Sequence, residues 1–350
     1  MRETFFSKKD SKWLHGVAAL LLIYHHLFNQ YCHFEHIALN RSWELNVAVF
    51  GRICVGIFAF ISGYGLSVKT SERKSIKSIL NVGFRQYLSF MKMYWFAFLL
   101  YVPLGVAFFG IKITSVGVLL RSFFYQPNQI YGEWWYVEQY IIILVGVSLF
   151  LCIYNHLEKY RYKRIIIIAA LTLIIGLIIC PYTRFIMAKV NRYVSIYLWI
   201  SIMAVIIEKN RIYEKIYSCF SNKIIQILLS IFLVVISYVC RIYYVYNKGY
   251  EWVDIIIVPI FVYAVIVLKK VLDLRILNSV GEYFGKYGTY LWLAHPVYLY
   301  YWCTGMVIWP KYSLAIFMWL TIISLGSAIV LSNMKRVIED VFTKCTKRLR

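Results

Sequence analysis

Charged residues are scarce in this 350-residue chain, and acidic residues are the scarcer kind. Only 15% of the residues are charged, and 16 Asp and Glu stand against 38 Lys and Arg. Soluble domains carry about 25% charged and about 45–50% apolar residues. Here 61% of the residues are hydrophobic and the mean hydropathy is +0.66. The composition excludes an ordinary soluble domain and predicts a polytopic membrane protein.

Proline and cysteine are few as well. The chain has six prolines and no repeat or low-complexity linker, which predicts a single domain over residues 1–350. None of the eight cysteines forms a CxxC pair, and most of them fall in apolar runs. This usage excludes a disulfide framework and typical zinc-ligand spacing, so we expect small buried cysteines and no metal.

Ten apolar runs are each near the length needed to cross about 30 Å of hydrocarbon. They predict an all-α, polytopic integral membrane protein with about ten transmembrane helices. The approximate limits are residues 13–31, 47–68, 86–110, 133–155, 165–180, 194–207, 224–246, 252–268, 287–309 and 312–334. The polar N-terminus and the absence of a small-residue cleavage site predict that the first run stays as a span.

Basic residues are distributed unevenly between the alternating connections. The inferred inner segments hold 27 of the 38 Lys and Arg, and the outer loops hold 9 when Arg241, near the outer end of the seventh run, is counted with them. This asymmetry predicts that both termini are cytoplasmic, with a basic cytoplasmic tail over residues 335–350. The net charge of +22 then reflects topology and contact with anionic membrane lipid rather than nucleic-acid binding. The oligomeric state is left open.

Three histidines lie in the first apolar run. His15 and His26 are eleven residues apart, an offset about 20° from three full helical turns, and so share one face roughly 16 Å apart. His25 points about 80° away from His15. An ionisable side chain is costly in hydrocarbon, which makes these residues candidates for function. A neutral imidazole can accept a proton from a hydroxyl near neutral pH.

The second run combines a cation with small residues. Arg52 lies within the run, where an arginine is costly unless it reaches the outer interface. Ser62, Gly63 and Gly65 follow it and permit close approach of another helix or of a ligand.

Further candidates lie near the ends of later spans. Arg85 and Lys92 follow a basic inner loop, and the guanidinium fork of arginine suits phosphate oxygens. Glu133 precedes an aromatic cluster that includes Trp135 and Tyr136, which suits either an interfacial belt or a carbohydrate platform. His295 lies in the ninth run, directly before a proline that can kink the helix.

Taken in order, these elements resemble the motifs of the acyltransferase family 3 integral-membrane enzymes, which O-acylate bacterial surface polysaccharides and related glycans. The resemblance covers nearly the whole chain. The matching elements are the His15–His26 spacing, the Phe58–Tyr64 stretch, Arg85, the Trp135-Tyr136 pair and the Gly285–Pro296 segment. The chain departs from the family where His15 replaces the usual Arg or Lys, and where Gly288 or Thr289 replaces a Ser.

The resemblance implies a bacterial plasma-membrane O-acetyltransferase. Its donor would be cytoplasmic acetyl-CoA or another acyl-CoA, and its acceptor a hydroxyl of a cell-surface or lipid-linked glycan. His26 would be the general base or a transient acyl carrier. His15 would assist it, and Arg85 and Lys92 would bind the donor. The supporting residues would be Arg52, Ser62, Trp135, Tyr136 and His295.

Two other interpretations use the same polar residues. His15, Glu138 and Asp254 within spans, together with Pro259, are also typical of a transporter or glycan flippase. A metal site is a further alternative, but its candidate residues have no established ligand spacing. They are His25, His26, His33, Glu35 and His36.

Overall fold

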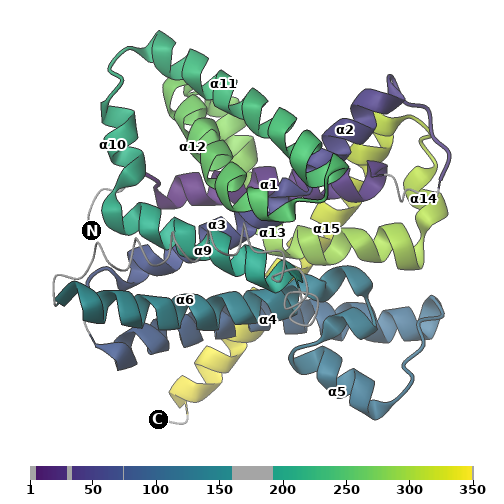
Figure 1. Cartoon of the computed structure of the whole chain (residues 1–350). Helices are drawn as coiled ribbons and strands as arrows, with labels where there is room; N and C mark the ends of the chain where they lie inside the picture. The colour runs from purple at the N-terminus through teal and green to yellow at the C-terminus, as the bar shows by residue number, and fades with distance from the viewer. Residues whose placement is uncertain (1–4, 30–33, 74, 160–191, 349–350) are drawn as a thin grey trace.

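The computed structural model describes residues 5–29, 34–73, 75–159 and 192–348, and over these ranges the chain forms helices and no strand. Figure 1 shows the long helices packed into one bundle. The helices of the first half are α1 (Lys8–Phe28), α2 (Arg41–Gly51), α3 (Ile53–Thr70), α4 (Ile76–Phe108), α5 (Val116–Phe124), η1 (Pro127–Gln129), η2 (Gly132–Trp135) and α6 (Tyr136–Lys159).

The second half continues the helical pattern after the gap at residues 160–191. Its elements are α9 (Arg192–Asn210), α10 (Ile212–Ser218), α11 (Lys223–Cys240), η3 (Arg241–Asn247), η4 (Glu251–Val253), α12 (Asp254–Leu272), α13 (Arg275–Pro296), η5 (Val297–Trp302), α14 (Thr304–Ile308) and α15 (Ser313–Arg348). The predicted fifth span, residues 165–180, lies outside the described residues. The helix α15 continues through most of the segment predicted as a basic tail.

Six helical segments of the described chain are long and apolar enough to cross a membrane. They are Arg41–Thr70, Ile76–Phe108, Gly132–Leu157, Lys223–Asn247, Glu251–Leu272 and Ser313–Val341. The predicted first and sixth spans fall on α1 and α9, which do not belong to this group. The predicted ninth span, residues 287–309, is not one helix: it covers the second half of α13 and then η5 and α14. In α1 and α13, histidines and other polar residues lower the hydropathy.

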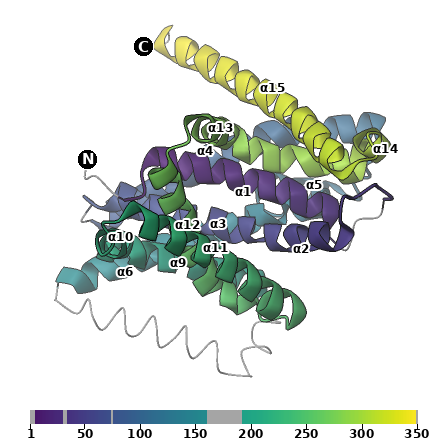
Figure 2. The ribbon, with the colours of Figure 1, turned by 90° about the horizontal axis from the view of Figure 1, so that it is seen from above.

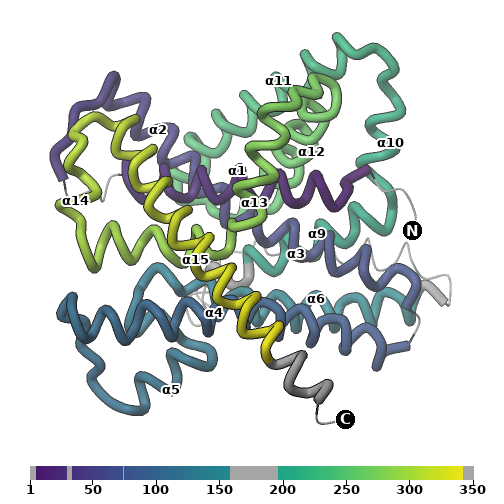
Figure 3. Tube along the Cα trace, turned by 180° about the vertical axis from the view of Figure 1, so that it is seen from behind, coloured from purple at the N-terminus to yellow at the C-terminus, as the bar shows by residue number. Residues whose placement is uncertain are grey.

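The membrane-like helices differ in how much of their surface is covered. Only 17% of the most apolar window of α11 is buried, and Leu228, Phe232 and Val235 are among its exposed apolar side chains. The helix α15 is also largely uncovered and lies along the outside of the bundle (Figures 2 and 3). Such exposed apolar faces fit a lipid environment, because hydrocarbon tails are as apolar as these side chains.

The helices α1 and α13 cross at glycines and run in the same direction. A Cβ atom on Gly16 would lie 2.1 Å from the carbonyl oxygen of Gly281, and one on Gly285 would lie 1.7 Å from that of Lys12. Glycines at such a crossing let the two backbones touch. The predicted alternation of ten spans likewise requires the first and ninth spans to run in the same direction.

Three of the long helices are interrupted, and the interruptions have local causes. The chain bends at Arg52, between α2 and α3. The π-helix η3 continues α11, and the π-helix η5 follows Pro296 at the end of α13. Proline has no N–H to continue the α-helical ladder, and π-turns of this kind are frequent at functional sites.

The glycine crossing gives a test of the fold. Gly285→Ala places a methyl group against the backbone of α1, so we expect it to destabilise the protein by about 1–3 kcal/mol. Gly326→Ala is the matched control, because a Cβ atom there meets nothing within 4 Å and alanine favours the helix by about 0.5–1 kcal/mol. Thermal unfolding in detergent should show a lower Tm for the first variant alone. Equal Tm values would contradict the crossing.

Candidate active site

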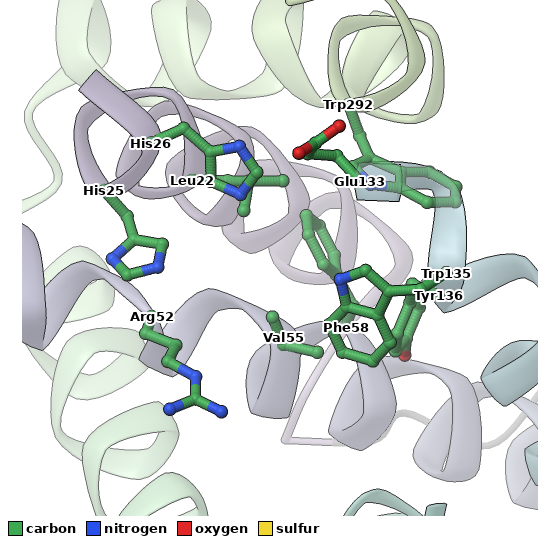
Figure 4. Close-up of a pocket in the computed structure, with 10 residues that line it drawn as sticks. All are labelled: Leu22, His25, His26, Arg52, Val55, Phe58, Glu133, Trp135, Tyr136 and Trp292. Carbon is green, nitrogen blue, oxygen red and sulfur yellow. The ribbon is translucent and has the colours of Figure 1, made fainter. Parts of the chain in front are cut away.

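A pocket of about 400 Å³ lies where α1, the α2–α3 bend, the start of α6 and α13 meet (Figure 4). Its size is within the range for small-ligand sites, about 300–1,000 Å³. It is lined by Leu22, His25, His26, Arg52, Val55, Phe58, Glu133, Trp135, Tyr136 and Trp292. Four of the residues predicted from the sequence therefore meet in one place: His26, Arg52, Trp135 and Tyr136.

The two neighbouring histidines of α1 both reach the pocket, in different roles. The Nδ1 atom of His25 lies 2.8 Å from the carbonyl oxygen of Ala48, and because a carbonyl only accepts, Nδ1 is the donor. The Nδ1 atom of His26 is buried without a hydrogen-bond partner. The Tyr300 hydroxyl donates to the backbone oxygen of His26 at 2.8 Å and pins the helix there. Helical periodicity places His25 and His26 on different faces of α1, yet both line the pocket in the structure.

A ring of aromatic side chains forms the other wall. Trp135 and Tyr136 are perpendicular, with ring centroids 5.8 Å apart, and Tyr136 is equally perpendicular to Trp292 at the same distance. Sequence reasoning missed Trp292, which lies in the segment that carries His295. Aromatic faces beside a few polar groups are typical of small-molecule sites and can stack on a flat apolar ring face.

The carboxylate of Glu133 is held at the rim of this wall. The Tyr301 hydroxyl donates to Oε2 of Glu133 at 2.7 Å and accepts from the backbone N–H of Gly132 at 2.7 Å. Trp134 points away from the pocket and donates from Nε1 to the carbonyl of Leu293 at 2.9 Å. These bonds tie η2 to α13 and η5, so the aromatic wall has a fixed place relative to the histidines.

Arg52, the cation of the pocket, is held by an ion pair, and a second, buried ion pair lies behind it. Arg52 Nη2 lies 3.3 Å from Oε1 of Glu251. Behind it, buried Arg241 forms a two-pronged ion pair with Asp254, at 3.0 and 3.1 Å. Arg241 also donates to the carbonyl oxygen of Val49 at 2.8 Å. The bend that presents Arg52 is thus held by a guanidinium that satisfies a carbonyl at the end of α2.

Two predicted residues lie outside the pocket because they are used in packing. His15 packs against Phe58, with ring centroids 4.8 Å apart, and against Gly288, where a Cβ atom would lie 2.3 Å from its Nδ1. Phe58 lines the pocket, so its ring separates His15 from the cavity. The hydroxyl of Ser62 donates to the carbonyl of Phe58 within α3 at 2.7 Å, so its role is local.

The remaining predicted residues are also outside the pocket lining. Arg85 is exposed on α4, and Lys92 pairs with Glu339 at 3.6 Å on the surface. His295 is fully buried behind His26, with ring centroids 5.0 Å apart.

Comparison with known proteins decides the family. The sequence profile of the acyltransferase domain family (acyltransferase family 3) matches residues 9–333. The chain belongs to acyltransferase family 3. Comparison with curated proteins and with solved structures gave no significant match. With its apolar helices, this acyltransferase family 3 protein is a multi-pass membrane acyltransferase.

The family assignment and the structure bear on the alternative interpretations. Asp254, a residue that the transporter interpretation needs, is committed to Arg241. Pro259, the proline of the same interpretation, also has a packing partner, since Tyr213 donates to its carbonyl oxygen at 2.6 Å. In the described part of the chain no three His, Cys, Asp or Glu side chains are grouped as metal ligands, and His33 lies outside that part.

The buried ion pair of this acyltransferase family 3 protein gives a stability prediction. Asp254→Asn leaves Arg241 unpaired in a buried site, so we expect a loss of about 3–5 kcal/mol. Lys92→Gln breaks a surface ion pair in which the side chains of Lys92 and Glu339 are 54% and 43% exposed, respectively. This change should alter stability by less than about 1 kcal/mol. Thermal unfolding of both variants in detergent measures the difference. Similar losses for the two variants would show that Arg241 does not depend on Asp254.

Proposed function

We propose that this protein is a bacterial plasma-membrane O-acyltransferase. It moves an acetyl or other short acyl group from cytoplasmic acyl-CoA to a hydroxyl of a cell-surface or lipid-linked glycan. The observation that carries the proposal is the position of His26 in the wall of an aromatic pocket that Trp135 and the hydrogen-bonded carboxylate of Glu133 also line (Figure 4).

The pocket suits a sugar as acceptor. The faces of Trp135 and Trp292 offer flat apolar surfaces for the C–H face of a sugar ring. The carboxylate of Glu133 and the guanidinium of Arg52 offer an acceptor and a donor for ring hydroxyls. A volume of about 400 Å³ accommodates a sugar unit and the acyl end of the donor, but not a whole coenzyme.

His26 performs the proton transfer in this proposal. Its Nε2 accepts the proton of the acceptor hydroxyl while that oxygen forms a bond to the acyl carbon. The carbon–sulfur bond then breaks, and His26 returns the proton to the leaving thiolate. The products are the acyl ester and the free thiol, and His26 is regenerated. In the alternative route, His26 Nε2 first carries the acyl group and then passes it to the hydroxyl.

The donor would bind through the cytoplasmic cations. Arg85 is exposed on α4 near the basic inner loop, and Lys92 lies two turns further along the same helix. The guanidinium fork suits the phosphates of a coenzyme A donor. His15 packs against Phe58, which lines the pocket, so it would act on the bound donor only through the position of that ring.

Transfer should depend on His26. Purified protein is incubated with radiolabelled acetyl-CoA and extracted surface glycan, and label in the glycan is counted. His26→Ala should lower the rate by about 10²–10⁴-fold, because proton transfer by a positioned side chain contributes that much. His156→Ala, at an exposed position near the end of α6, should keep the wild-type rate.

Labelled protein that forms without glycan would favour the acyl-carrier route. Full glycan labelling by folded His26→Ala would overturn the role of His26. Glycan movement by the wild-type protein without any consumption of acyl-CoA would overturn the proposed function itself.

Donor binding should depend on Arg85. We expect Arg85→Gln to raise the KM for acetyl-CoA by about tenfold, the value of one lost charge-assisted hydrogen bond of about 1.4 kcal/mol or more, with little change in kcat. Lys77→Gln removes another exposed cation of α4 and serves as the control. An unchanged KM for the Arg85 variant would remove this residue from the donor site.

A further inference from the structure

His295 is buried beyond the pocket wall, and its environment fixes the position of its hydrogen. The side chain is fully buried at the end of α13. Its Nδ1 lies 2.9 Å from the carbonyl oxygen of Leu291. Because that oxygen can only accept, Nδ1 carries the hydrogen, and Nε2 of the neutral ring presents a lone pair.

The lone pair of His295 has no hydrogen-bond donor in the structure. Nε2 is buried without a partner, although buried polar atoms are almost always paired and an unpaired one costs free energy. The adjacent imidazole of His26 also lacks a hydrogen bond, because its Nδ1 is buried without a partner. Each of the two rings therefore has one unpaired buried nitrogen.

The two nitrogens form no hydrogen bond in the structure, but the two rings are close enough for a rotation of the side chains to bring them together. Their centroids are 5.0 Å apart and their planes are inclined by 67°. Rings at this separation reach the hydrogen-bond range of roughly 2.7–3.2 Å when a nitrogen of each faces the other. The parallel α1 and α13 hold the two residues at the same level, and Tyr300 fixes the backbone of α1 at His26.

The other neighbours of His26 are committed elsewhere. His25 stacks against His26 with centroids 5.5 Å apart, but its Nδ1 donates to Ala48. The Tyr300 hydroxyl donates to the His26 carbonyl rather than to the ring. Among these side chains, only His295 presents a buried acceptor that lacks a donor.

We propose that His295 is a positioning residue for His26. Its Nε2 accepts the hydrogen on Nδ1 of His26 and thereby holds His26 in the tautomer whose Nε2 lone pair faces the pocket. When His26 takes the proton of the acceptor hydroxyl, the same hydrogen bond stabilises the imidazolium. The proton then leaves from Nε2 of His26 to the thiolate, and the protonation of His295 does not change. This role rests on the proposed function, but the hydrogen bond itself requires no substrate.

The tautomer of His26 can be measured directly. Protein containing ¹⁵N-labelled histidine is studied by solid-state NMR in bilayers, with the His26 and His295 signals assigned from His26→Gln and His295→Gln. We expect Nδ1–H in both rings of the wild type. In His295→Leu, which has no acceptor, His26 should shift to the Nε2–H tautomer. His295→Gln returns an acceptor oxygen near the position of Nε2 and should retain Nδ1–H on His26.

Kinetics provide the second readout. His295→Leu should lower kcat for acyl transfer by about 10- to 100-fold with little change in the KM for the acceptor, as a wrong tautomer of the base requires. His295→Gln should stay within a few-fold of the wild type. A structural role alone would not separate the two variants in this way.

The outcomes separate this inference from the proposed function. An Nε2–H tautomer of His26 in the wild type would overturn the positioning role, whether or not His295→Leu folds. An unchanged tautomer in folded His295→Leu would overturn it too. The expected tautomers in a wild-type protein that transfers no acyl group would support the hydrogen bond and contradict only the acyltransferase mechanism.

Discussion

The contact between α1 and α13 at glycine is the constraint on which the candidate site depends. Side chains on Gly16 or Gly285 would collide with backbone atoms of the opposite helix, so the close approach of the two helices in this register requires glycine at both positions. This register places His26 beside His295 and His15 beside Gly288. The imidazoles thus owe their arrangement to positions that carry no side chain.

The bend between α2 and α3 is the second fixed point, and a buried ion pair holds it in place. A break in a membrane helix frees carbonyl groups that hydrocarbon cannot satisfy. Arg241 satisfies those of Val49 and Phe50, and Asp254 balances its charge. Glu251, three residues before Asp254, holds Arg52. One short segment after α11 therefore supplies both the support for the bend and the partner of the cation that the bend presents.

Hydropathy was sufficient to predict a helical membrane protein, the resemblance of the motifs predicted the family, and the histidines directed attention to the part of α1 that lines the pocket. Runs of apolar residues are local properties, and the described parts of the predicted spans are helices. The importance of Arg241 could not be predicted, because in the sequence it resembles one of the few basic residues of an outer loop. Its role depends on a partner thirteen residues away and on a carbonyl 192 residues away. His15 shows the same limit, since helical periodicity gives its face but not the ring of Phe58 that covers it.

The distribution of partners around the pocket bears on why histidine, rather than a carboxylate, would be the base of the proposed transfer. Each carboxylate near the pocket has a partner in the structure: Glu133 accepts from Tyr301, Glu251 pairs with Arg52, and Asp254 pairs with Arg241. A carboxylate held by a donor or a cation is a weaker base, because each such interaction stabilises its charged form. Nδ1 of His26 has no hydrogen-bond partner in the structure, and a neutral imidazole avoids the cost of a buried charge until the moment of proton transfer. The ion pairs therefore fix the shape of the pocket, and in the proposed transfer only His26 takes up and returns the proton.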